Sequence, residues 1–542
     1  MFAAAIIGSF ALYLVIGAIV GRTVKNKADY YVAGRSAPTF LIAGTLVASF
    51  LSTVSFMGEL GFSYDGYPVV MLILTAINIS GYVIGVLAFG RYLRRSEALT
   101  VPEFFGKRFN STGLQALAGV MVVVGVGLYL VAVTQGLALV LTQLIDLPYW
   151  LVLLIVWAAY TLFTLMSGSR GVLVNDTLMF LIFALAAVLG LGGVIAAAGG
   201  PVEAMHKMSA IGSKPDALSW HGLTGETSYM GTPADTLIYA ITLGVVWATV
   251  VAVSPWQSSR YLMARNEHVA LRSGLVATAS LAVIYLFLTF GGFSINIFNP
   301  NIEPSEIAFI WAAENILPPV VGVIIVTGIA AAGLSSAASF LSLIGFSVAN
   351  DIMPWISRRS SVTADDATTL RTSRIVMLIA GLAVLGITFI APPAVMTIGY
   401  FAATLFAAAW GPVAVWCIKG TRMTTRGAAA GMISGFLVVG ILNGLVEFAG
   451  VELPTIANPV ILGLLASVAG VLVGNIGQKA PSVGVEFLAK ILPTPAAEKS
   501  RSDLLITRRV TTATAVVLVL CTGVLVVLYA IPHADFIAGA MP

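Results

Sequence analysis

Fourteen long apolar stretches run through the chain and restrict it to a fold that spans a membrane. A helix needs about 20 mostly apolar residues to cross the hydrocarbon core of a bilayer. Hydrophobic residues make up 58% of the 542 residues and charged residues 10%, a composition that excludes a water-soluble globular protein. We therefore predict an all-α polytopic membrane protein with about 14 transmembrane helices. The spans are placed near residues 3–21, 39–64, 68–94, 113–142, 149–167, 174–199, 235–255, 272–298, 318–350, 372–393, 396–418, 426–448, 457–475 and 511–532.

The distribution of lysine and arginine predicts how these spans are oriented. Cytoplasmic connections of a membrane protein carry an excess of both residues. Only Lys207 and Lys214 lie in the loop 200–234, which we place outside together with both termini. We expect a multi-pass protein of the plasma or inner membrane, and we interpret the net charge of +4 as a topology signal, not as a surface for nucleic acid. The other 26 of the 28 basic residues fall in the cytoplasmic connections 22–38, 91–112, 168–173, 256–272, 351–374, 419–426 and 476–510.

The order of the spans indicates an internal repeat. An extra helix with a cytoplasmic loop (1–38) precedes a first set of five spans (39–199), and a second set of five (235–418) follows the external loop 200–234. An odd number of spans inverts the second set relative to the first, which is the pattern of a five-plus-five inverted repeat. The remaining chain, 419–542, supplies additional helices and a cytoplasmic loop at 476–510.

The second predicted span is rich in small polar residues, among them Ser49, Ser52, Thr53 and Ser55. A segment of this kind can unwind and turn its backbone carbonyls toward a cavity, where they bind ions or small molecules. Small residues also let membrane helices pack closely against one another. The segment alone leaves both interpretations open.

Two adjacent hydroxyls, Ser335 and Ser336, stand in the middle of the long small-residue helix predicted over 318–350. Neutral oxygens at mid-membrane suit a dehydrated small cation, and the lack of an accompanying carboxylate, His or Cys cluster favours sodium over magnesium or zinc. The alternative is that each hydroxyl bonds to a carbonyl of the preceding turn, as serines in membrane helices commonly do.

Four motifs follow one another between residue 30 and about residue 420. They are YYVAGRS (30–36), RYLRRSEALTVPEFFGKRFN (91–110), GSRGVLVNDTLMFLIF (168–183), and the Ser335–Ser336 helix with Asn350 and Asp351 after it. Jointly they resemble the sodium/solute symporter family, closest to its bacterial monocarboxylate/acetate and proline branches. The resemblance implies a LeuT-type fold with a sodium site near the bilayer midplane.

When the family's sodium ligands are carried over to the matching residues, the resemblance implies a sodium site made of neutral oxygens. Such a site suits a hard monovalent cation and can release it again. The implied ligands are the carbonyl oxygens of Ala48, Leu51 and Ala332 and the hydroxyls of Ser335 and Ser336.

Two acidic residues lie inside predicted spans. Asp176 stands three residues into the sixth span and matches a residue that lines the family's sodium exit route. An aspartate in this position can also cap the helix together with Asn175. Glu59 lies in the outer half of the second span, where it can attract cations or reach interfacial water, and it fits no pattern of the family.

The resemblance also bears on the solute. Similarity to the proline branch puts Ser52, Tyr129 and Trp247 in the solute pocket, and Ser55 follows Ser52 by three residues on the same helix face. The two aromatic residues can equally serve bundle packing.

Three other segments look like the acetate and monocarboxylate branch: LSTVSFMG (51–58), SYDGY (63–67) and TTRGAAAGM (424–432). The segment SPWQSSRYLMARN (254–266) departs from that branch. We expect no Lys or Arg at membrane depth to pair an anion, so a carboxylate would rest on helix N-termini, hydroxyls or the sodium ion itself.

These patterns predict a sodium-coupled symporter that imports a small organic solute by alternating access, with Na⁺ as the coupling ion. A monocarboxylate or other organic acid is favoured, and proline, another amino acid or a vitamin such as pantothenate is the alternative. We expect the solute, sodium and the lipid bilayer as partners and no obligate protein partner. A membrane-embedded transferase is disfavoured because the histidines fall in loops or near the tail. They are His206, His221, His268 and His533.

Overall fold

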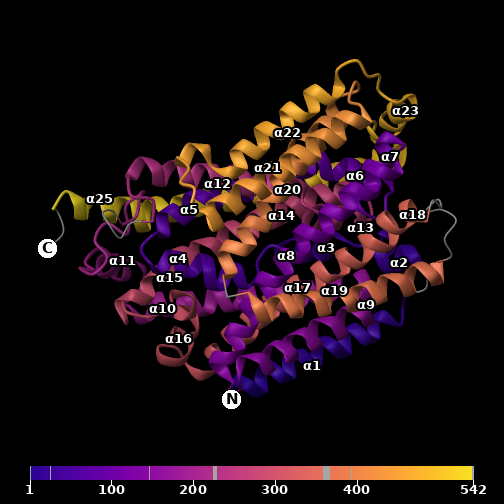
Figure 1. Cartoon of the computed structure of the whole chain (residues 1–542). Helices are drawn as coiled ribbons and strands as arrows, with labels where there is room; N and C mark the ends of the chain where they lie inside the picture. Colours follow the sequence, from indigo (N-terminus) through magenta and orange to yellow (C-terminus); the bar gives the residue numbers. More distant parts are fainter. Residues whose placement is uncertain are drawn as a thin grey trace.

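The computed structural model describes residues 2–24, 26–145, 147–223, 229–357, 366–391 and 394–539. Every regular element in these ranges is helical, and an isolated backbone bridge joins Ala37 to Ala264. The long helices lie side by side in one bundle, and shorter helices cover its two ends (Figure 1).

The helices follow the predicted spans in chain order. The first set and the helix before it comprise α1 (Phe2–Gly21), α3 (Thr39–Ala48), η2 (Val54–Glu59), α4 (Leu60–Tyr64), α5 (Pro68–Gly85), η3 (Val86–Gly90), α6 (Arg91–Ser96), α8 (Thr112–Leu144), α9 (Tyr149–Ala186), η4 (Ala187–Leu191) and α10 (Gly192–Ala197). The second set comprises α12 (Pro233–Val253), α13 (Pro255–Met263), α14 (Glu267–Leu286), η5 (Phe287–Gly291), α15 (Gly292–Ser294), η6 (Ile295–Ile297), α17 (Pro319–Ser347), η8 (Val348–Ile352), α18 (Met353–Ile356), α19 (Asp366–Ile390) and α20 (Val395–Lys419). The C-terminal part comprises α21 (Thr425–Ala449), α22 (Pro459–Asn475), α24 (Arg501–Leu525), η11 (Val526–Ala530) and α25 (Ile531–Ile537).

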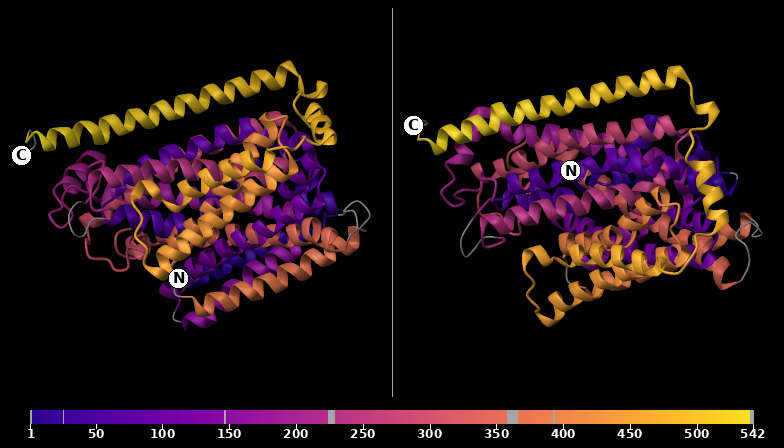
Figure 2. Two further views of the ribbon diagram at one scale, coloured as in Figure 1. Left: turned by 45° about the horizontal axis from the view of Figure 1, so that its top comes forward. Right: turned by 90° about the horizontal axis from the view of Figure 1, so that it is seen from above.

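Short helices connect these elements and mark the two ends of the bundle. α2, α7, α18 and α23 gather at one end, the predicted cytoplasmic one, and α10, α11, α15 and α16 gather at the other, the predicted outer one (Figure 1). α24 runs along the outside of the bundle as one long helix (Figure 2), where it packs mainly on α14. The connecting elements are α2 (Lys27–Val32), η1 (Ala33–Arg35), α7 (Val101–Phe109), α11 (Pro201–Ser209), η7 (Ser305–Ile307), α16 (Ala308–Asn315), η9 (Thr455–Ala457), α23 (Ser482–Ile491) and η10 (Ala496–Glu498).

The helical class predicted from the sequence is confirmed. By length and composition, 12 helical segments of the described chain can cross a membrane. Two shorter apolar helices, α3 and α22, lie where the second and thirteenth spans were predicted. The count of about 14 spans therefore stays a prediction.

The second predicted span is interrupted in its middle. α3 ends at Ala48 and helical structure resumes at Val54. The residues between them, 49–53, are all buried. Unwinding, one of the two interpretations of this serine-rich segment, is what the structure shows.

The seventh predicted span is broken as well, which the sequence analysis did not anticipate. α12 ends at Val253 and α13 begins at Pro255, with Ser254 between them at ψ 148°. A proline disfavours the helical conformation in the residue that precedes it, so the chain breaks there. All of α13 is buried, so its residues lie inside the bundle and not in the cytoplasmic connection predicted at 256–272. The first span of each set is therefore discontinuous, as in transporters built from inverted repeats.

A sharp bend at Gly168, inside α9, separates the fifth and sixth predicted spans. Its φ of 55° is rarely open to residues with a side chain, and a Cβ there would lie 2.4 Å from the ring of Tyr30. The sixth span therefore starts at Gly168, six residues earlier than the predicted 174. Asp176 lies correspondingly deeper in the bundle than predicted.

Helices α5 and α12, from opposite sets, approach so closely that only glycine fits between them. A Cβ on Gly81 would lie 2.3 Å from the carbonyl oxygen of Ala248 and 2.7 Å from its Cα, both of which are backbone atoms. We expect Gly81→Leu to destabilise the protein by about 3 kcal/mol or more, because the two helices must separate. Thermal unfolding in detergent tests this, with Gly127→Leu as the control, since no atom lies within 4 Å of a Cβ there. Equal unfolding temperatures for both variants would contradict the expected clash.

Candidate functional site

The two broken helices meet α17 inside the bundle and bring predicted sodium ligands together. α3, α13 and α17 contact one another. The hydroxyl oxygen of Ser335 lies 3.4 Å from the carbonyl oxygen of Ala48, and both residues are fully buried. Since α3 ends at Ala48, this carbonyl belongs to the helix end that lacks intrahelical donors. Two oxygens that each lie about 2.4 Å from a cation and at right angles are separated by about 3.4 Å, so the observed spacing suits a shared ion.

The hydroxyl of Ser336 is a second candidate ligand for a cation. Its hydroxyl is fully buried and has no hydrogen-bond partner in the part of the chain that the structure describes. A buried hydroxyl without a partner costs about 1–3 kcal/mol, which a bound cation would offset. Neither serine bonds to the preceding turn, whereas Ser342 does, with Oγ donating to the carbonyl of Ala338 at 2.8 Å. The back-bonding alternative for the serine pair is therefore wrong.

The remaining two predicted sodium ligands lie in the same region. Leu51 is buried in the break after α3, and Ala332 is buried on α17, one turn before Ser336. The residues present thus fit a sodium ion held by neutral oxygens. That each of these five residues coordinates the ion stays a prediction.

Asp176 lies beside Ser335 and not at a helix end, so the expectation that no carboxylate accompanies the serine pair is wrong. Its Oδ1 accepts the hydroxyl of Ser335 at 2.7 Å, and its Oδ2 accepts the hydroxyl of Thr45 at 2.5 Å. Because Ser335 donates its hydrogen to the carboxylate, the lone pairs of its oxygen remain free for a cation. Asp176 is fully buried within α9, and its neighbour Asn175 donates to the carbonyl of Tyr13. The capping interpretation of Asp176 and Asn175 is therefore wrong.

Arg260 is a charged residue that the sequence analysis misplaced. It was assigned to the cytoplasmic connection 256–272, but α13 carries it into the bundle, where it is 3% exposed. Its Nη2 lies 3.6 Å from Oδ2 of Asp176 and donates to the hydroxyl of Ser339 at 2.6 Å. The expectation of no Lys or Arg at membrane depth is thus wrong, although Asp176 already pairs this arginine. The Ser254–Pro255 dipeptide was the available signal, since it marks the break that redirects α13.

The cavity between this cluster and the predicted cytoplasmic end is small. A cavity of about 20 Å³, lined in part by Thr100, Arg260 and Ser339, lies there. This volume admits about one water molecule and no organic solute. Asp176 contacts both Ser335 and Arg260, so it lies between the serine pair and the cavity. Its role in sodium exit stays a prediction.

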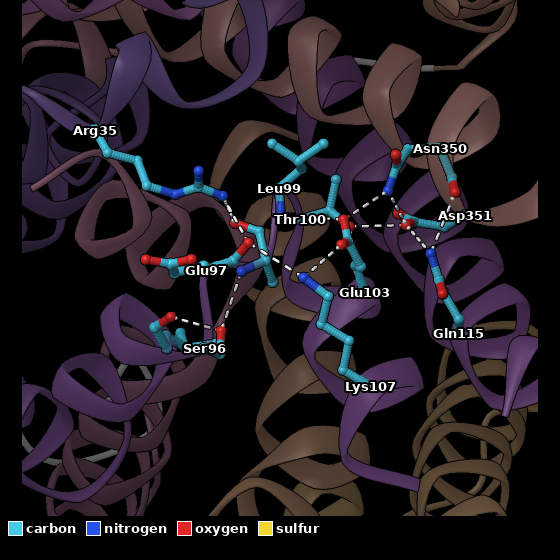
Figure 3. Close-up of polar contacts among 12 residues, drawn as sticks. Arg35, Ser96, Glu97, Leu99, Thr100, Glu103, Lys107, Gln115, Asn350 and Asp351 are labelled. Atoms are coloured by element: carbon cyan, nitrogen blue, oxygen red, sulfur yellow. Dashed lines mark hydrogen bonds and ion pairs between the residues drawn. The ribbon is translucent and has the colours of Figure 1, made fainter. Parts of the chain in front are cut away.

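A second polar network holds helix α7, at the predicted cytoplasmic end, against η8, which follows α17 (Figure 3). Oδ1 of Asp351 accepts the hydroxyl of Thr100 at 2.7 Å and the amide of Gln115 at 2.8 Å. The amide of Asn350 donates to Oε2 of Glu103 at 3.1 Å, and Thr100 also caps α7 by accepting from the backbone N–H of Glu103. Two motifs that are far apart in the sequence, 91–110 and Asn350–Asp351, therefore touch each other.

The first motif joins the same end of the bundle. Arg35, from the 30–36 motif, donates to the carbonyls of Glu97 at 2.6 Å and Ala98 at 3.2 Å (Figure 3). Together with the bond between Thr100 and Asp351, these contacts link three of the four motifs at the predicted cytoplasmic end. We expect some of them to separate when a path opens at that end.

We expect Thr100→Val to favour the state that is open to the cytoplasm. The substitution removes both the hydrogen bond to Asp351 and the cap of α7, and a hydrogen bond to a charged group contributes about 1.5–3 kcal/mol. A cysteine introduced by Ser259→Cys, at the small cavity, should then react with a maleimide about tenfold faster. Thr372→Val is the matched control, because Thr372 is half-buried and its hydroxyl bonds within its own helix, to the carbonyl of Thr368. Equal labelling rates in the Thr100 and Thr372 variants would contradict a gating role for the network.

The predicted solute residues form two neighbouring groups. In the first, the hydroxyl of Ser52 accepts from the backbone of Val54 at 3.1 Å and bonds with Tyr129. The ring of Tyr129 packs on Trp256 and Phe340, with centroids 5.4 and 4.8 Å away. The packing interpretation therefore describes part of what Tyr129 does, and its contact with the solute stays a prediction.

The second group surrounds Glu59. The hydroxyl of Ser55 lies 3.5 Å from that of Tyr285, which donates to Oε2 of Glu59 at 2.6 Å. Tyr400 donates to Oε1 of Glu59 at 3.1 Å, and its ring lies 5.1 Å from the ring of Trp247. Glu59 is only 4% exposed, so it does not reach interfacial water. A role for Ser55 and Trp247 in solute binding stays a prediction.

A larger cavity lies at the predicted outer side of Glu59. It measures about 400 Å³, which is within the range of small-molecule pockets. Its lining includes Gly58 and Tyr400, which adjoin Glu59, together with the acidic residues Asp65 and Glu306. This cavity has room for a small solute, whereas the cavity described above on the predicted cytoplasmic side does not.

The fold and the site define a secondary transporter that couples the movement of a solute to a small cation. The model of the sodium:solute symporter family matches residues 30–435, and the chain belongs to this family. It is a sodium-coupled symporter with Na⁺ as the coupling ion, and its expected family is confirmed.

Two curated relatives of the chain are named for different solutes. The chain is 24% identical over 503 residues to the sodium/proline symporter of Salmonella typhimurium, covering 88% of this chain and 94% of that protein. It is 26% identical over 319 residues to the sodium/pantothenate symporter of Haemophilus influenzae, a match that spans 57% of this chain and 64% of that protein.

A solved structure confirms the LeuT-type fold. The chain superimposes on the substrate-bound outward-open state of a Na⁺-coupled sialic acid symporter with a TM-score of 0.72. The match covers 88% of this chain and 98% of the other, at 17% sequence identity. The five-plus-five inverted repeat predicted from the sequence is the fold of this protein.

Proposed function

We propose that the protein imports a small organic solute together with sodium by alternating access. The observation that carries this proposal is the buried, unpartnered hydroxyl of Ser336 beside the contact between Ser335 and Ala48. A sodium ion bound there would join α3 of the first repeat to α17 of the second. Its binding energy would then bias the equilibrium between the two conformations, because a ligand favours the state that it binds better. Both termini would lie outside, as the distribution of basic residues predicts.

The sodium gradient supplies enough free energy for accumulation. A potential of roughly 100 mV contributes about 2.3 kcal/mol per charge. A tenfold sodium gradient adds about 1.4 kcal/mol. The sum, about 3.7 kcal/mol, can concentrate a neutral solute roughly 400-fold per ion.

A small organic acid, such as a monocarboxylate, is the favoured solute. Support comes from the break in the seventh span, where the hydroxyl of Ser254 and the amide nitrogen of Gln257 are fully buried and lack partners among the described residues. Both can donate to a carboxylate, and the N-terminus of α13 at the same place favours an anion. Proline, another amino acid and pantothenate also carry a carboxylate, so they remain the alternatives.

Uptake into proteoliposomes tests the proposal. Radiolabelled propionate, L-proline and pantothenate are offered to the purified protein with an inward sodium gradient or with potassium in its place. We expect saturable uptake of at least one solute with sodium and none with potassium. Uptake that a proton gradient drives equally well without sodium, or no sodium-dependent uptake of any of them, would overturn the proposal.

A further inference from the structure

Four aromatic side chains and one buried carboxylate form a closed ring of contacts, and the sodium site does not use this carboxylate. The ring of Phe50 lies 6.0 Å from that of Trp247 and 6.2 Å from that of Tyr285, and Trp247 lies 5.1 Å from Tyr400. Tyr285 and Tyr400 complete the ring, because both donate their hydroxyl hydrogens to the carboxylate of Glu59. We call these five residues the Glu59 cage.

The carboxylate of the cage has no counter-ion among the residues that the structure describes. No Lys, Arg or His of the described residues pairs with Glu59, whose polar contacts are the hydroxyls of Tyr285, Tyr400 and Ser55. An ionised carboxylate out of water is costly unless a cation or a full set of hydrogen bonds compensates it. A carboxylate offers about four acceptor positions, so these hydroxyls leave room for a charged donor.

The walls of the cage suit a large, weakly hydrated cation. Aromatic faces attract ammonium groups, with tryptophan the strongest. A sodium ion prefers a shell of hard oxygens, and four of the five cage residues are aromatic side chains without a carboxylate or carbonyl ligand. The cage therefore differs in chemistry from the oxygen-only site at Ser335 and Ser336.

The cage also lies where a solute would arrive. Gly58 and Tyr400, which adjoin Glu59, line the outer cavity. Asp65 and Glu306 line the same cavity, and their negative charges raise the local concentration of cations. On its inner side, Ser55 brings the cage next to the predicted solute residues.

We propose that the Glu59 cage receives the positively charged nitrogen of the transported solute. This inference rests on the proposed function and narrows it, since the solute then carries an ammonium group as well as a carboxylate. Simple monocarboxylates and pantothenate lack an ammonium group, so the inference replaces the monocarboxylate favoured above with an amino acid, such as proline, or with a betaine.

Pairs of ligands that differ only in this charge test the inference. Glycine betaine is compared with 3,3-dimethylbutanoate, in which carbon replaces the nitrogen, and L-proline with cyclopentanecarboxylate. The purified protein is unfolded thermally in sodium at rising concentrations of each compound, because a bound ligand stabilises the folded state. We expect at least one of the nitrogen compounds to stabilise the protein at about tenfold to hundredfold lower concentration than its carbon analogue.

A variant then assigns the preference to Glu59. Glu59→Gln keeps the size of the side chain and removes its charge, so the preference for nitrogen should disappear. Glu306→Gln removes a charge from the rim of the same cavity and should leave the preference intact. The comparison of ligand pairs in the wild-type protein decides the inference even where Glu59→Gln fails to fold.

Several results would overturn the inference. They are equal or stronger binding of the carbon analogues, no binding of either nitrogen compound, or a preference that Glu59→Gln leaves unchanged. Loss of one bound sodium in Glu59→Gln without a change in ligand preference would make the cage a second sodium site instead. In each of these cases, sodium-driven uptake of a solute that carries a carboxylate would still support the proposed function. If no such uptake occurs, both the proposed function and this inference are wrong.

Discussion

Replacing both Ser335 and Ser336 with alanine is expected to raise the sodium concentration for half-maximal uptake about tenfold or more. The two hydroxyls are the side-chain oxygens of the predicted site, and the one on Ser336 has no other partner among the described residues. Loss of two ligands to a cation removes at least as much free energy as one hydrogen bond to a charged group, about 1.5 kcal/mol or more. The measurement is uptake, over a range of sodium concentrations, of the solute that the proteoliposome experiment identifies.

A third serine on the same helix is the matched control. Ser342 is also buried, but its hydroxyl bonds to the carbonyl of Ala338, so Ser342→Ala should leave the sodium dependence unchanged. Identical sodium dependence in the double variant and the wild-type protein would show that the serine pair does not bind the coupling ion.

Asp176→Asn is expected to destabilise the protein by about 3–5 kcal/mol, because it leaves Arg260 buried without its anion. Arg260 and Asp176 are 3% and 0% exposed at their side chains, so water compensates neither charge. The temperature at which the purified protein loses its folded state in detergent should fall by several degrees.

A variant that lacks both charges of this ion pair is the control. In the double variant Asp176→Asn, Arg260→Gln both charges are gone, so we expect it to be more stable than Asp176→Asn alone. Glu203→Gln, in an exposed pair with Lys207, should have little effect on stability. If Asp176→Asn unfolds at the wild-type temperature, or if the double variant is less stable than the single one, the buried pair does not stabilise this fold.

The sequence predicted those features that depend on neighbouring residues or on a long apolar run. The spans follow from hydropathy. A run of small polar residues made a break in the second span one of two open interpretations, and the structure places this break after Ala48. The motifs identified the family because they are spread over most of the chain. Their residues also meet in space, as the bond between Thr100 and Asp351 shows.

What the sequence did not predict depends on contacts between distant segments. Arg260 was counted as a loop residue, because hydropathy alone cannot distinguish a buried polar helix such as α13 from a cytoplasmic connection. Asp176 was considered a helix cap because its partners, Thr45 and Ser335, come from two other helices. The partners of Glu59 could not be predicted for the same reason, since Tyr285 and Tyr400 lie more than 200 residues away.

The most direct test of the sodium site is binding of ²²Na⁺ to the purified protein at equilibrium, without any solute. Saturable binding to the wild-type protein that persists in Ser342→Ala and disappears in the double variant of Ser335 and Ser336 is the predicted result. Saturable binding of equal affinity in that double variant would contradict the account, because the ion would then be held somewhere other than between α3 and α17.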